Sequence, residues 1–204
     1  GGHAYIIKKG QRFITNSAIA SMGYDLPAAI GTFVASRDPE YQEEPSARED
    51  IILLTGDGSI QMNLQELQTI IHHRMPIKIF LINNGGYHSI RQTQKNFFGE
   101  PLVGIGEDSH DLSFPDMEKL AAAYGYPYVV AHHNEEVAGA VEKTLAMDGP
   151  VICEFYVTTD QNFEPKSSAK RLPDGTLVSP PLEDLSPFLP DEEMDKLMII
   201  PRIK

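Results

Sequence analysis

One stretch of the chain, from Gly56 to Asn84, combines acidic, amide and glycine residues in an order that could bind a metal ion. It reads GDGSIQMNLQELQTIIHHRMPIKIFLINN, so a glycine-flanked aspartate follows one apolar run and paired asparagines end the next. Asp57 supplies a carboxylate, Asn84 an amide oxygen, and the Gly85-Gly86 turn supplies main-chain carbonyls. Oxygen donors of this kind suit Mg²⁺ or Ca²⁺ rather than zinc, and they leave coordination positions for water or phosphate oxygens.

The apolar runs beside these residues must place them close together. Residues 51–55 (IILLT) and 77–82 (IKIFLI) have the pattern of short strands that are buried on both faces of a parallel sheet. Ligands of open α/β sheets bind in the crevice at the carboxyl ends of the strands. We therefore expect Asp57 and Asn84 to project into one crevice from two strand ends.

The residues around Asp57 favour an anionic ligand bound together with the metal. Gly56 and Gly58 carry no side chains, so the backbone can approach a bulky anion closely. The run 63–66 resembles a capping box, with Asn63 as the N-cap and Glu66 reaching back to it. A helix beginning there would direct its free N–H groups toward the crevice. The pattern as a whole predicts a metal-bridged diphosphate site.

The remaining sequence alternates between segments with helical and with strand character. Helices are expected over 21–35, 116–125 and 135–147, and further strands over 128–131 and 151–157. This order predicts the α/β class, a three-layer α/β/α domain with a mostly parallel sheet. We expect that domain to span residues 1–158, with its core at about 11–157. A proline-rich and partly ordered tail is expected over 159–204, because seven of the fifteen prolines follow residue 160.

Composition narrows the class of protein further. The chain has 204 residues, 41% of them hydrophobic, which is enough for one sizeable core. Its net charge of −12 argues against a nucleic-acid-binding protein, which would need a basic surface. The single cysteine favours a reducing compartment. No apolar run reaches membrane-spanning length and the N-terminus lacks the form of a signal peptide, so we expect a soluble cytoplasmic protein without membrane contacts.

The motifs in this order resemble the signature of thiamine-diphosphate-dependent enzymes. That signature is a GDG triplet (56–58), 24 intervening residues and a pair of asparagines (83–84). The upstream segment SMGYDLPAAIG (21–31) is similar to the cofactor-facing entry of the same domain in the acetolactate synthase group. The resemblance covers roughly residues 11–157. It implies the diphosphate-binding (PP) domain of such an enzyme and the thiamine-diphosphate-binding fold.

The resemblance also assigns roles to individual residues. It implies that the Asp57 carboxylate, the Asn84 side chain and the Gly86 main-chain carbonyl bind Mg²⁺, while Asn83 ties the loop together. Residues 89 and 90 would lie near the reacting carbon of the cofactor. The residues implied to contact thiamine diphosphate are Ala20, Ser21, Met22, Gly56, Gly58, Ser59, Met62, Tyr87 and His88.

Several of these residues have alternative roles. Met62 falls where the family places an apolar wedge that bends the cofactor, but methionine also fills gaps in cores. Glu66 is expected to be a helix cap rather than a catalytic acid. Among the histidines, only His88 is placed near the substrate, where it is a candidate catalytic residue. Arg91 could pair with a substrate carboxylate or serve at a surface or interface. Cys153 is expected to be an inert buried thiol.

The implied function is that of a 2-keto acid decarboxylase or carboligase. In this family a PYR domain, of the same enzyme or of a partner subunit, supplies the glutamate that activates the cofactor, and nothing in this chain has that domain's pattern. We therefore expect a fragment or subunit of a larger enzyme that is inactive alone and acts within a homodimer or homotetramer. Thr93 stands where acetolactate synthases have a tryptophan, so the substrate is open. The tail over 161–177 resembles one that wraps over an active site or a neighbouring subunit.

Two alternatives come from other functional classes. One is a non-catalytic binding or regulatory module that has kept the PP fold, although the intact residues Asp57, Asn84 and Gly86 count against it. The other is a nucleotide-binding α/β domain. Neither GxGxxG after a first strand nor GxxxxGK[ST] is present, so the phosphate-binding motifs of those domains are missing.

Overall fold

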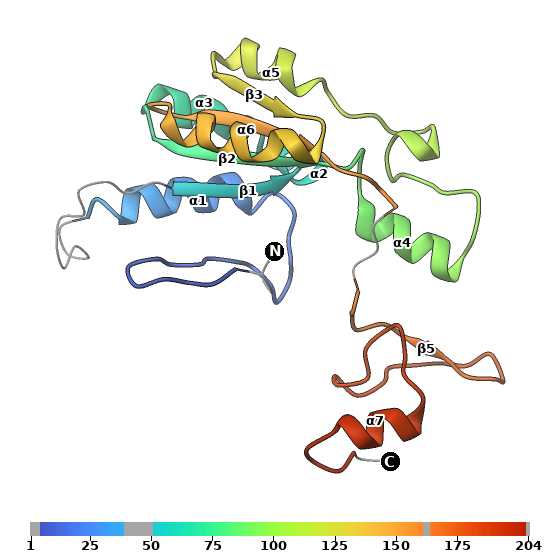
Figure 1. Cartoon of the computed structure of the whole chain (residues 1–204). Helices are drawn as coiled ribbons and strands as arrows, with labels where there is room; N and C mark the ends of the chain where they lie inside the picture. The colour runs from blue at the N-terminus through green and yellow to red at the C-terminus, as the bar shows by residue number, and fades with distance from the viewer. Residues whose placement is uncertain (1–4, 39–50, 161–163, 203–204) are drawn as a thin grey trace. The chain divides into compact units, whose positions relative to one another are not determined.

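A four-stranded parallel sheet lies at the centre of the N-terminal part of the chain (Figure 1). In the computed structural model, residues 5–38, 51–160 and 164–202 are described. The chain divides into two units, 1–159 and 160–204. The strands of the first unit are β1 (Ile51–Gly56), β2 (Ile77–Asn83), β3 (Tyr128–Ala131) and β4 (Val151–Tyr156), in the order β1-β2-β4-β3. All four predicted strands are confirmed.

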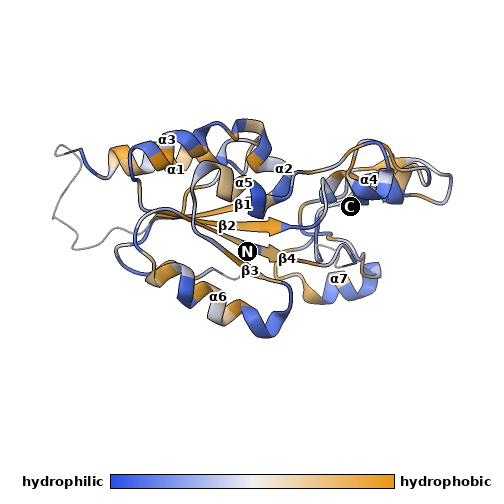
Figure 2. Ribbon diagram, turned by 90° about the horizontal axis from the view of Figure 1, so that it is seen from above, coloured by the Kyte–Doolittle hydropathy of each residue, from blue (hydrophilic) through white to orange (hydrophobic). Residues whose placement is uncertain are grey.

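Helices cover both faces of this sheet, which confirms the three-layer α/β/α class. The helices α1 (Asp25–Ala35), α3 (Glu66–His72) and α5 (Met117–Tyr124) lie on one face, and α6 (Asn134–Ala146) lies on the other (Figure 2). Helix α4 (His88–Phe97) follows β2 and lies beyond the end of the sheet (Figure 1). Every crossover between parallel strands thus passes through helical structure, as parallel pairing requires.

Two apolar clusters fill the spaces between these layers. The larger one packs alternate β2 residues Ile77, Ile79 and Leu81 against α1, α3 and α5. The smaller one places Phe80 and Cys153 with residues of α6. Because side chains along a strand alternate between faces, the continuous run IKIFLI supplies both clusters. Cys153 is fully buried, as expected, and this burial raises the pKa of its thiol.

Strand β1 departs from the expectation that it is buried on both faces. Ile52 and Leu54 are 53% and 61% exposed, respectively, while the alternate residues Leu53 and Thr55 are buried. The reason is topological, because β1 is an edge strand and α6 packs mainly on β3 and β4. An apolar run identifies a strand but cannot say whether its second face has a partner helix.

The start of α1 was predicted four residues too early. Residues before Asp25 form turns, with Gly23 at φ +87° and Ala20 at φ +53°, both left-handed conformations that a helix cannot continue. Pro27 lies in the first turn of the observed helix, where its missing N–H has no intrahelical partner to lose. The SMGYDLPAAIG segment is therefore a loop followed by a helix, and this loop faces the site described below.

The predicted capping box at 63–66 is wrong. The helical path begins directly at the end of β1 with α2 (Asp57–Ile60) and continues through a 3₁₀ turn (Gln61–Asn63) before α3. The Asn63 side chain donates to the Gly23 carbonyl (2.6 Å), and Glu66 accepts from the Thr69 hydroxyl (2.9 Å). Because helical backbone already surrounds position 63, no free N-terminus exists there for Asn63 to cap.

The C-terminal unit is small and partly regular. It contains an antiparallel pair of short strands, β5 (Lys170–Arg171) and β6 (Leu177–Val178), and helix α7 (Asp191–Leu197). Lys170 forms an ion pair with the buried Asp184 at 3.2 Å and lies over the ring of Phe188. Part of the predicted tail segment 161–177, residues 161–163, lies outside the described residues.

The buried Tyr126 and the half-buried Tyr128 make stability sensitive to alkaline pH. Tyr126 donates to the Leu67 carbonyl (2.8 Å), and Tyr128 donates to the Glu154 carboxylate. Burial raises the pKa of both hydroxyl groups above the ordinary value near 10. The folded state therefore keeps these protons when the unfolded state has lost them, so stability is present below about pH 10 and is lost as the pH rises above it.

We expect the free energy of unfolding to fall between pH 10 and 11, by up to about 1.4 kcal/mol per pH unit for Tyr126 alone. Urea denaturation at pH 9, 10, 10.5 and 11 measures this slope. Tyr126→Phe should be less stable at pH 8 because the hydrogen bond to Leu67 is lost, yet it should show a shallower alkaline slope. An identical slope in both proteins would contradict the assignment.

Candidate cofactor and metal site

Asp57 links the loops that follow β1 and β2. It is the first residue after β1 and is only 2% exposed. Its Oδ1 accepts a hydrogen bond from the Gly58 N–H (2.8 Å), and its Oδ2 accepts one from the Gly86 N–H (2.9 Å). Two segments nearly thirty residues apart in sequence thus meet at one carboxylate, at the carboxyl edge of the sheet.

The pKa of Asp57 is set by burial and by backbone N–H groups, which act in opposite directions. Burial raises the pKa of this carboxyl group, and the backbone N–H groups of Gly86, Gly58, Gly85 and Asn84 act in the opposite direction. The N–H groups satisfy the carboxylate geometrically but do not fully replace the water it has lost. A buried carboxylate of this kind is stabilised by a nearby positive ion.

Asn84 carries the most informative atom of the site. Its side-chain oxygen Oδ1 is buried and has no hydrogen-bond partner among the described residues. An unsatisfied buried acceptor costs about 1–3 kcal/mol, so native structures keep few of them without a reason. The Gly86 carbonyl accepts from the His88 N–H (3.0 Å) and has a second lone pair. A carboxylate, an orphaned amide oxygen and a carbonyl in one loop system fit a hard divalent cation.

Asn83, the other asparagine of the pair, holds the loop in place. Its Nδ2 donates to Glu154 Oε1 (2.7 Å), and its Oδ1 accepts from the Gly85 N–H (3.0 Å). This is the structural role that the resemblance implied. Glu154, fully buried on β4, was missed in the sequence analysis, although a lone acid inside the apolar strand VICEFYV is an available signal.

A second segment, residues 104–109, packs on the loop that follows β2 (residues 84–87) and was also missed. The Tyr87 N–H donates to the Ile105 carbonyl (2.7 Å), and the backbones of Gly86 and Gly106 pair in an isolated bridge. A Cβ atom on Gly86 would lie 2.0 Å from the Ile105 oxygen, so only glycine allows this approach. No spacing rule links position 86 to position 106, and the pairing could not be predicted from the sequence.

The loop before α1 joins the same site. The Gly23 N–H donates to the Ser59 hydroxyl oxygen (3.0 Å), and Gly23 also receives the Asn63 hydrogen bond described above. These contacts bring Ala20, Ser21 and Met22, all exposed, next to the first turns after Asp57. The resemblance had implied that these three residues and Ser59 belong to one cofactor surface, and the structure places their segments side by side.

Two further predicted contact residues flank Gly58 and Gly23. The ring of Tyr87 lies against Gly58, where an added Cβ atom would be 2.4 Å from Tyr87 Cε1. Met62 packs its Cβ on Gly23 yet is 50% exposed, which excludes the alternative that it fills the core. Its role as an apolar wedge stays a prediction.

His88 and Arg91 form a buried pair at the start of α4. Arg91 Nη1 lies 3.3 Å from His88 Nδ1. Because arginine can only donate, Nδ1 is the acceptor and the ring proton is on Nε2. Arg91, for which a substrate contact and a surface or interface role were both open, has a buried side chain whose guanidinium contacts the Gly85 carbonyl and Asp108. The neighbouring residues 89 and 90 are exposed.

Four further histidines lie outside this site. They stand at positions 72, 73, 132 and 133, and all four are exposed. Among the residues that the structure describes, no group of three histidine, cysteine or acidic side chains could hold a metal ion. None of the helices within the described ranges is long and apolar enough to cross a membrane.

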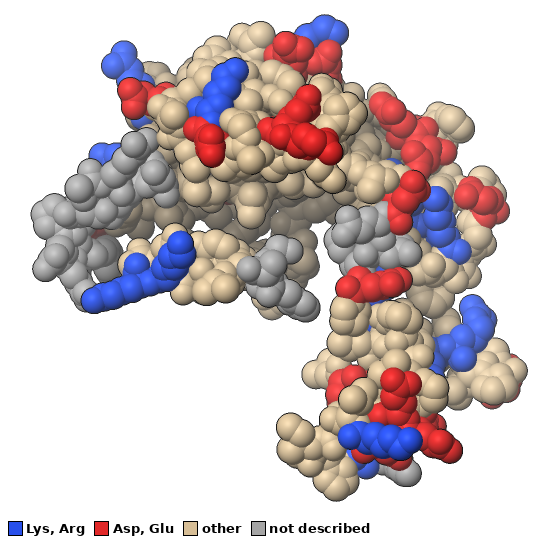
Figure 3. All heavy atoms as spheres, viewed as in Figure 1, with Lys and Arg blue, Asp and Glu red and all other residues tan. Residues whose placement is uncertain are grey.

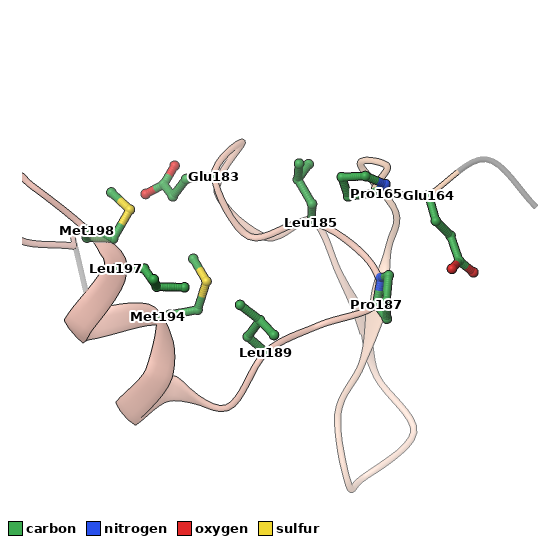
Figure 4. A pocket seen from close by; sticks show the side chains of 9 residues that line it. All are labelled: Glu164, Pro165, Glu183, Leu185, Pro187, Leu189, Met194, Leu197 and Met198. Carbon is green, nitrogen blue, oxygen red and sulfur yellow. The ribbon is translucent and has the colours of Figure 1, made fainter. Parts of the chain in front are cut away.

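A separate cavity of about 570 Å³ lies within the C-terminal unit (Figure 4). Its walls are apolar apart from two glutamates, and none of the residues placed around Asp57 contributes to it. The lining residues are Glu164, Pro165, Glu183, Leu185, Pro187, Leu189, Met194, Leu197 and Met198.

On the face seen in Figure 3, acidic and basic side chains are interspersed rather than gathered into a continuous basic surface.

Comparison with known proteins gives consistent matches. The family described as thiamine pyrophosphate enzyme, C-terminal TPP binding domain, matches residues 1–155. The acetolactate synthase large subunit of Pyropia yezoensis is 33% identical over 160 residues, which are 77% of this chain and 24% of that protein. The large subunit of acetolactate synthase isozyme 2 from Escherichia coli (strain K12) is 31% identical over 176 residues, covering 86% of this chain and 29% of that protein.

A solved structure gives the same picture at the level of the fold. The thiamine diphosphate-dependent 4-hydroxybenzoylformate decarboxylase of Rhodococcus jostii RHA1 matches with a TM-score of 0.57 and 27% sequence identity. The match covers 71% of this chain and 25% of that one. This chain therefore spans only about a quarter of the length of the relatives that it matches.

Proposed function

The chain belongs to the thiamine pyrophosphate enzymes as their C-terminal TPP-binding domain, of the acetolactate synthase-like kind, and from this premise we propose that it binds thiamine diphosphate through Mg²⁺. In this proposal it forms part of a larger 2-keto acid decarboxylase or carboligase. A cytoplasmic location belongs to the same proposal and rests on the single buried cysteine.

We assign the metal to three oxygens of this chain. The Asp57 carboxylate provides the charge, and the Asn84 amide oxygen and the Gly86 carbonyl complete the protein ligands. Asn83 keeps the loop in register through Gly85 and Glu154. Gly58, Ser59 and the backbone around Tyr87 form the wall beside the diphosphate, and the loop 20–22 lies next to them.

Thiamine diphosphate supplies, when bound, the electron sink that a 2-keto acid needs for the loss of CO₂. The contribution of this chain is to hold the diphosphate, to exclude water from one wall of the site and to present Met62 and His88 beside the cofactor. The acid that activates the aminopyrimidine would come from a PYR domain, in the same enzyme or in the partner subunit of a homodimer or homotetramer. The exposed side chains of Met22, Tyr24 and Met62 suit a face covered by such a domain.

The observation that best supports the proposal is the orphaned Asn84 Oδ1, in the loop whose backbone N–H groups reach the buried Asp57 carboxylate. A module that had kept only the fold would have no need for an arrangement that is unfavourable without a cation. Calorimetric titration with thiamine diphosphate, with Mg²⁺ and with EDTA, tests the proposal on this chain and on the longer polypeptide from the same gene. We expect binding that requires the metal, and metal-independent binding or none in the longer polypeptide would refute the proposal.

The 204-residue chain by itself should show no decarboxylation of pyruvate or of aromatic 2-keto acids, because it would lack the activating acid. Adding a PYR-domain polypeptide, or restoring that domain, should produce turnover that depends on thiamine diphosphate and Mg²⁺. CO₂ release is the measurement, with mass spectrometry to exclude contaminating longer enzyme. Robust turnover by the pure chain would overturn the assignment of that acid to another domain.

A further inference from the structure

The guanidinium of Arg91 is buried next to the proposed metal loop, residues 84–87. Arg91 lies in the first turn of α4 and its side chain is 1% exposed. Arginine keeps its charge at every ordinary pH, and a buried charge is unfavourable by several kcal/mol, to order of magnitude, unless partners compensate it. The fold must therefore supply partners for Arg91, and it draws them from the metal loop and from the segment packed on that loop.

The most informative partner is a single peptide group. Arg91 Nη2 donates to the Gly85 carbonyl oxygen at 3.1 Å. The N–H at the other end of the same peptide, that of Gly86, donates to Asp57 Oδ2 at 2.9 Å. The C=O and N–H of a trans peptide lie in one plane and point in opposite directions. A guanidinium and a carboxylate therefore hold the Gly85–Gly86 peptide from both sides.

The charge of Arg91 is compensated from the segment at 104–109. Its Nε lies 3.0 Å from Asp108 Oδ2, within a short 3₁₀ turn (Glu107–Ser109). The contact is an ion pair rather than an aligned hydrogen bond, since Nε has no acceptor in suitable geometry among the described residues. The same segment supplies the Ile105 carbonyl to the Tyr87 N–H. Arg91 thus connects the metal loop to the segment that packs on it.

We propose that Arg91, held by Asp108, is a positioning residue of the metal site that fixes and polarises the Gly85–Gly86 peptide. This inference rests on the function proposed above. A positive charge at the carbonyl end of a peptide strengthens the hydrogen bond that its N–H end donates, so Arg91 acts on Asp57 through this peptide. It also sets the orientation of Gly86, whose own carbonyl is the third proposed ligand. Groups that orient metal ligands in this way commonly change metal affinity by about 10–100-fold.

The first test needs neither metal nor cofactor. Hydrogen exchange measured by mass spectrometry on peptides covering 83–92 reports the opening of the Gly86 and Tyr87 amides. Arg91→Met and Asp108→Asn should exchange there at least about fivefold faster than wild type. Lys95→Met, on the exposed side of α4, and Glu107→Gln, the exposed neighbour of Asp108, are the matched controls and should match wild type. Unchanged exchange in both test variants would overturn the inference.

The second test measures Mg²⁺ affinity in the assembled enzyme at saturating thiamine diphosphate. Arg91→Met should weaken Mg²⁺ binding by about 10–100-fold, while kcat at saturating Mg²⁺ stays within about threefold of wild type. Arg91→Lys keeps the charge but not the fork of donors, and it should restore only part of the affinity. If Arg91→Met does not fold, Asp108→Asn carries both measurements.

The two tests separate the inference from the proposed function. Wild-type Mg²⁺ affinity in a variant with a loosened loop would overturn the positioning role while leaving the metal site in place. A wild-type enzyme without metal-dependent cofactor binding would refute the proposed function instead. In that case the exchange measurement still decides whether Arg91 holds the Gly85–Gly86 peptide.

Discussion

Asp57→Ala should abolish Mg²⁺-dependent binding of thiamine diphosphate. Asp57 would be the only charged protein ligand to a dication that also carries a diphosphate, and neutral amide and carbonyl oxygens alone bind Mg²⁺ weakly. Isothermal titration calorimetry in the assembled enzyme should show cofactor affinity lowered by at least about 100-fold in the presence of Mg²⁺. In the presence of EDTA, wild type and variant should be indistinguishable.

The pH dependence of the unfolding free energy shows whether Asp57→Ala has lost only its metal site or has also lost its fold. Burial raises the pKa of Asp57, so without metal the folded state holds this proton more tightly than the unfolded state does. The contribution of Asp57 to stability is then present below its ordinary pKa and is lost as the pH rises through the folded value. Asp57→Ala should remove this dependence, and the variant should remain folded near neutral pH.

Two control variants complete this experiment. Asp116→Ala removes an exposed acid that caps α5 (3.1 Å from Lys119 N), and it should lower stability by about 1 kcal/mol while cofactor binding is kept. Asn83→Ala should lower stability by about 1–3 kcal/mol, because it leaves the buried Glu154 with one partner fewer, and its binding should stay metal-dependent. Equal cofactor affinity in wild type and Asp57→Ala would rule out Asp57 as the metal ligand.

The local sequence pattern was sufficient to predict the four strands and the position of the candidate site residues directly after two of them. The run 77–82 is apolar because helices shield both faces of that strand, and the run 51–55 supplies the core on one face. Glycine and amide residues follow both runs because the chain must turn at the ligand edge. Both properties are local in sequence. The strand bounds and the adjacency of Asp57 to the loop after β2 followed from them.

The contacts that were missed all depend on tertiary neighbours. Whether Ile52 and Leu54 are covered depends on which faces of the sheet the helices occupy. Asn63 does not cap a helix because the helical path already begins at Asp57. The partners of Glu154 and Arg91 come from distant segments whose register no spacing rule fixes. Arg91 in particular has the sequence context of a surface residue, and only the fold shows that its charge is enclosed.

Gly86→Ala should have the second large effect, because at this position the backbone conformation and the available space both require glycine. Gly86 has φ +134°, which L-residues rarely adopt, and an added Cβ atom would lie 2.0 Å from the Ile105 carbonyl oxygen. The obstacle is backbone, and moving it would break the hydrogen bond between the Tyr87 N–H and the Ile105 carbonyl. We expect a loss of about 2–4 kcal/mol in unfolding free energy and no measurable Mg²⁺-dependent cofactor binding.

Gly104→Ala is the matched control for this variant. Gly104 lies in the 104–109 segment and also has a positive φ, +64°, but an added Cβ atom there would meet open space. It should lower stability by only about 1–2 kcal/mol, the usual penalty for a left-handed residue, and it should keep its cofactor affinity. Urea denaturation and calorimetry on both variants separate backbone strain from steric overlap. If Gly86→Ala bound cofactor like Gly104→Ala, the close packing of the 104–109 segment on the metal loop would not be needed for the site. The Gly86 carbonyl would then be free to reach the cation from more than one backbone conformation, and its assignment as a fixed third ligand would have to be abandoned.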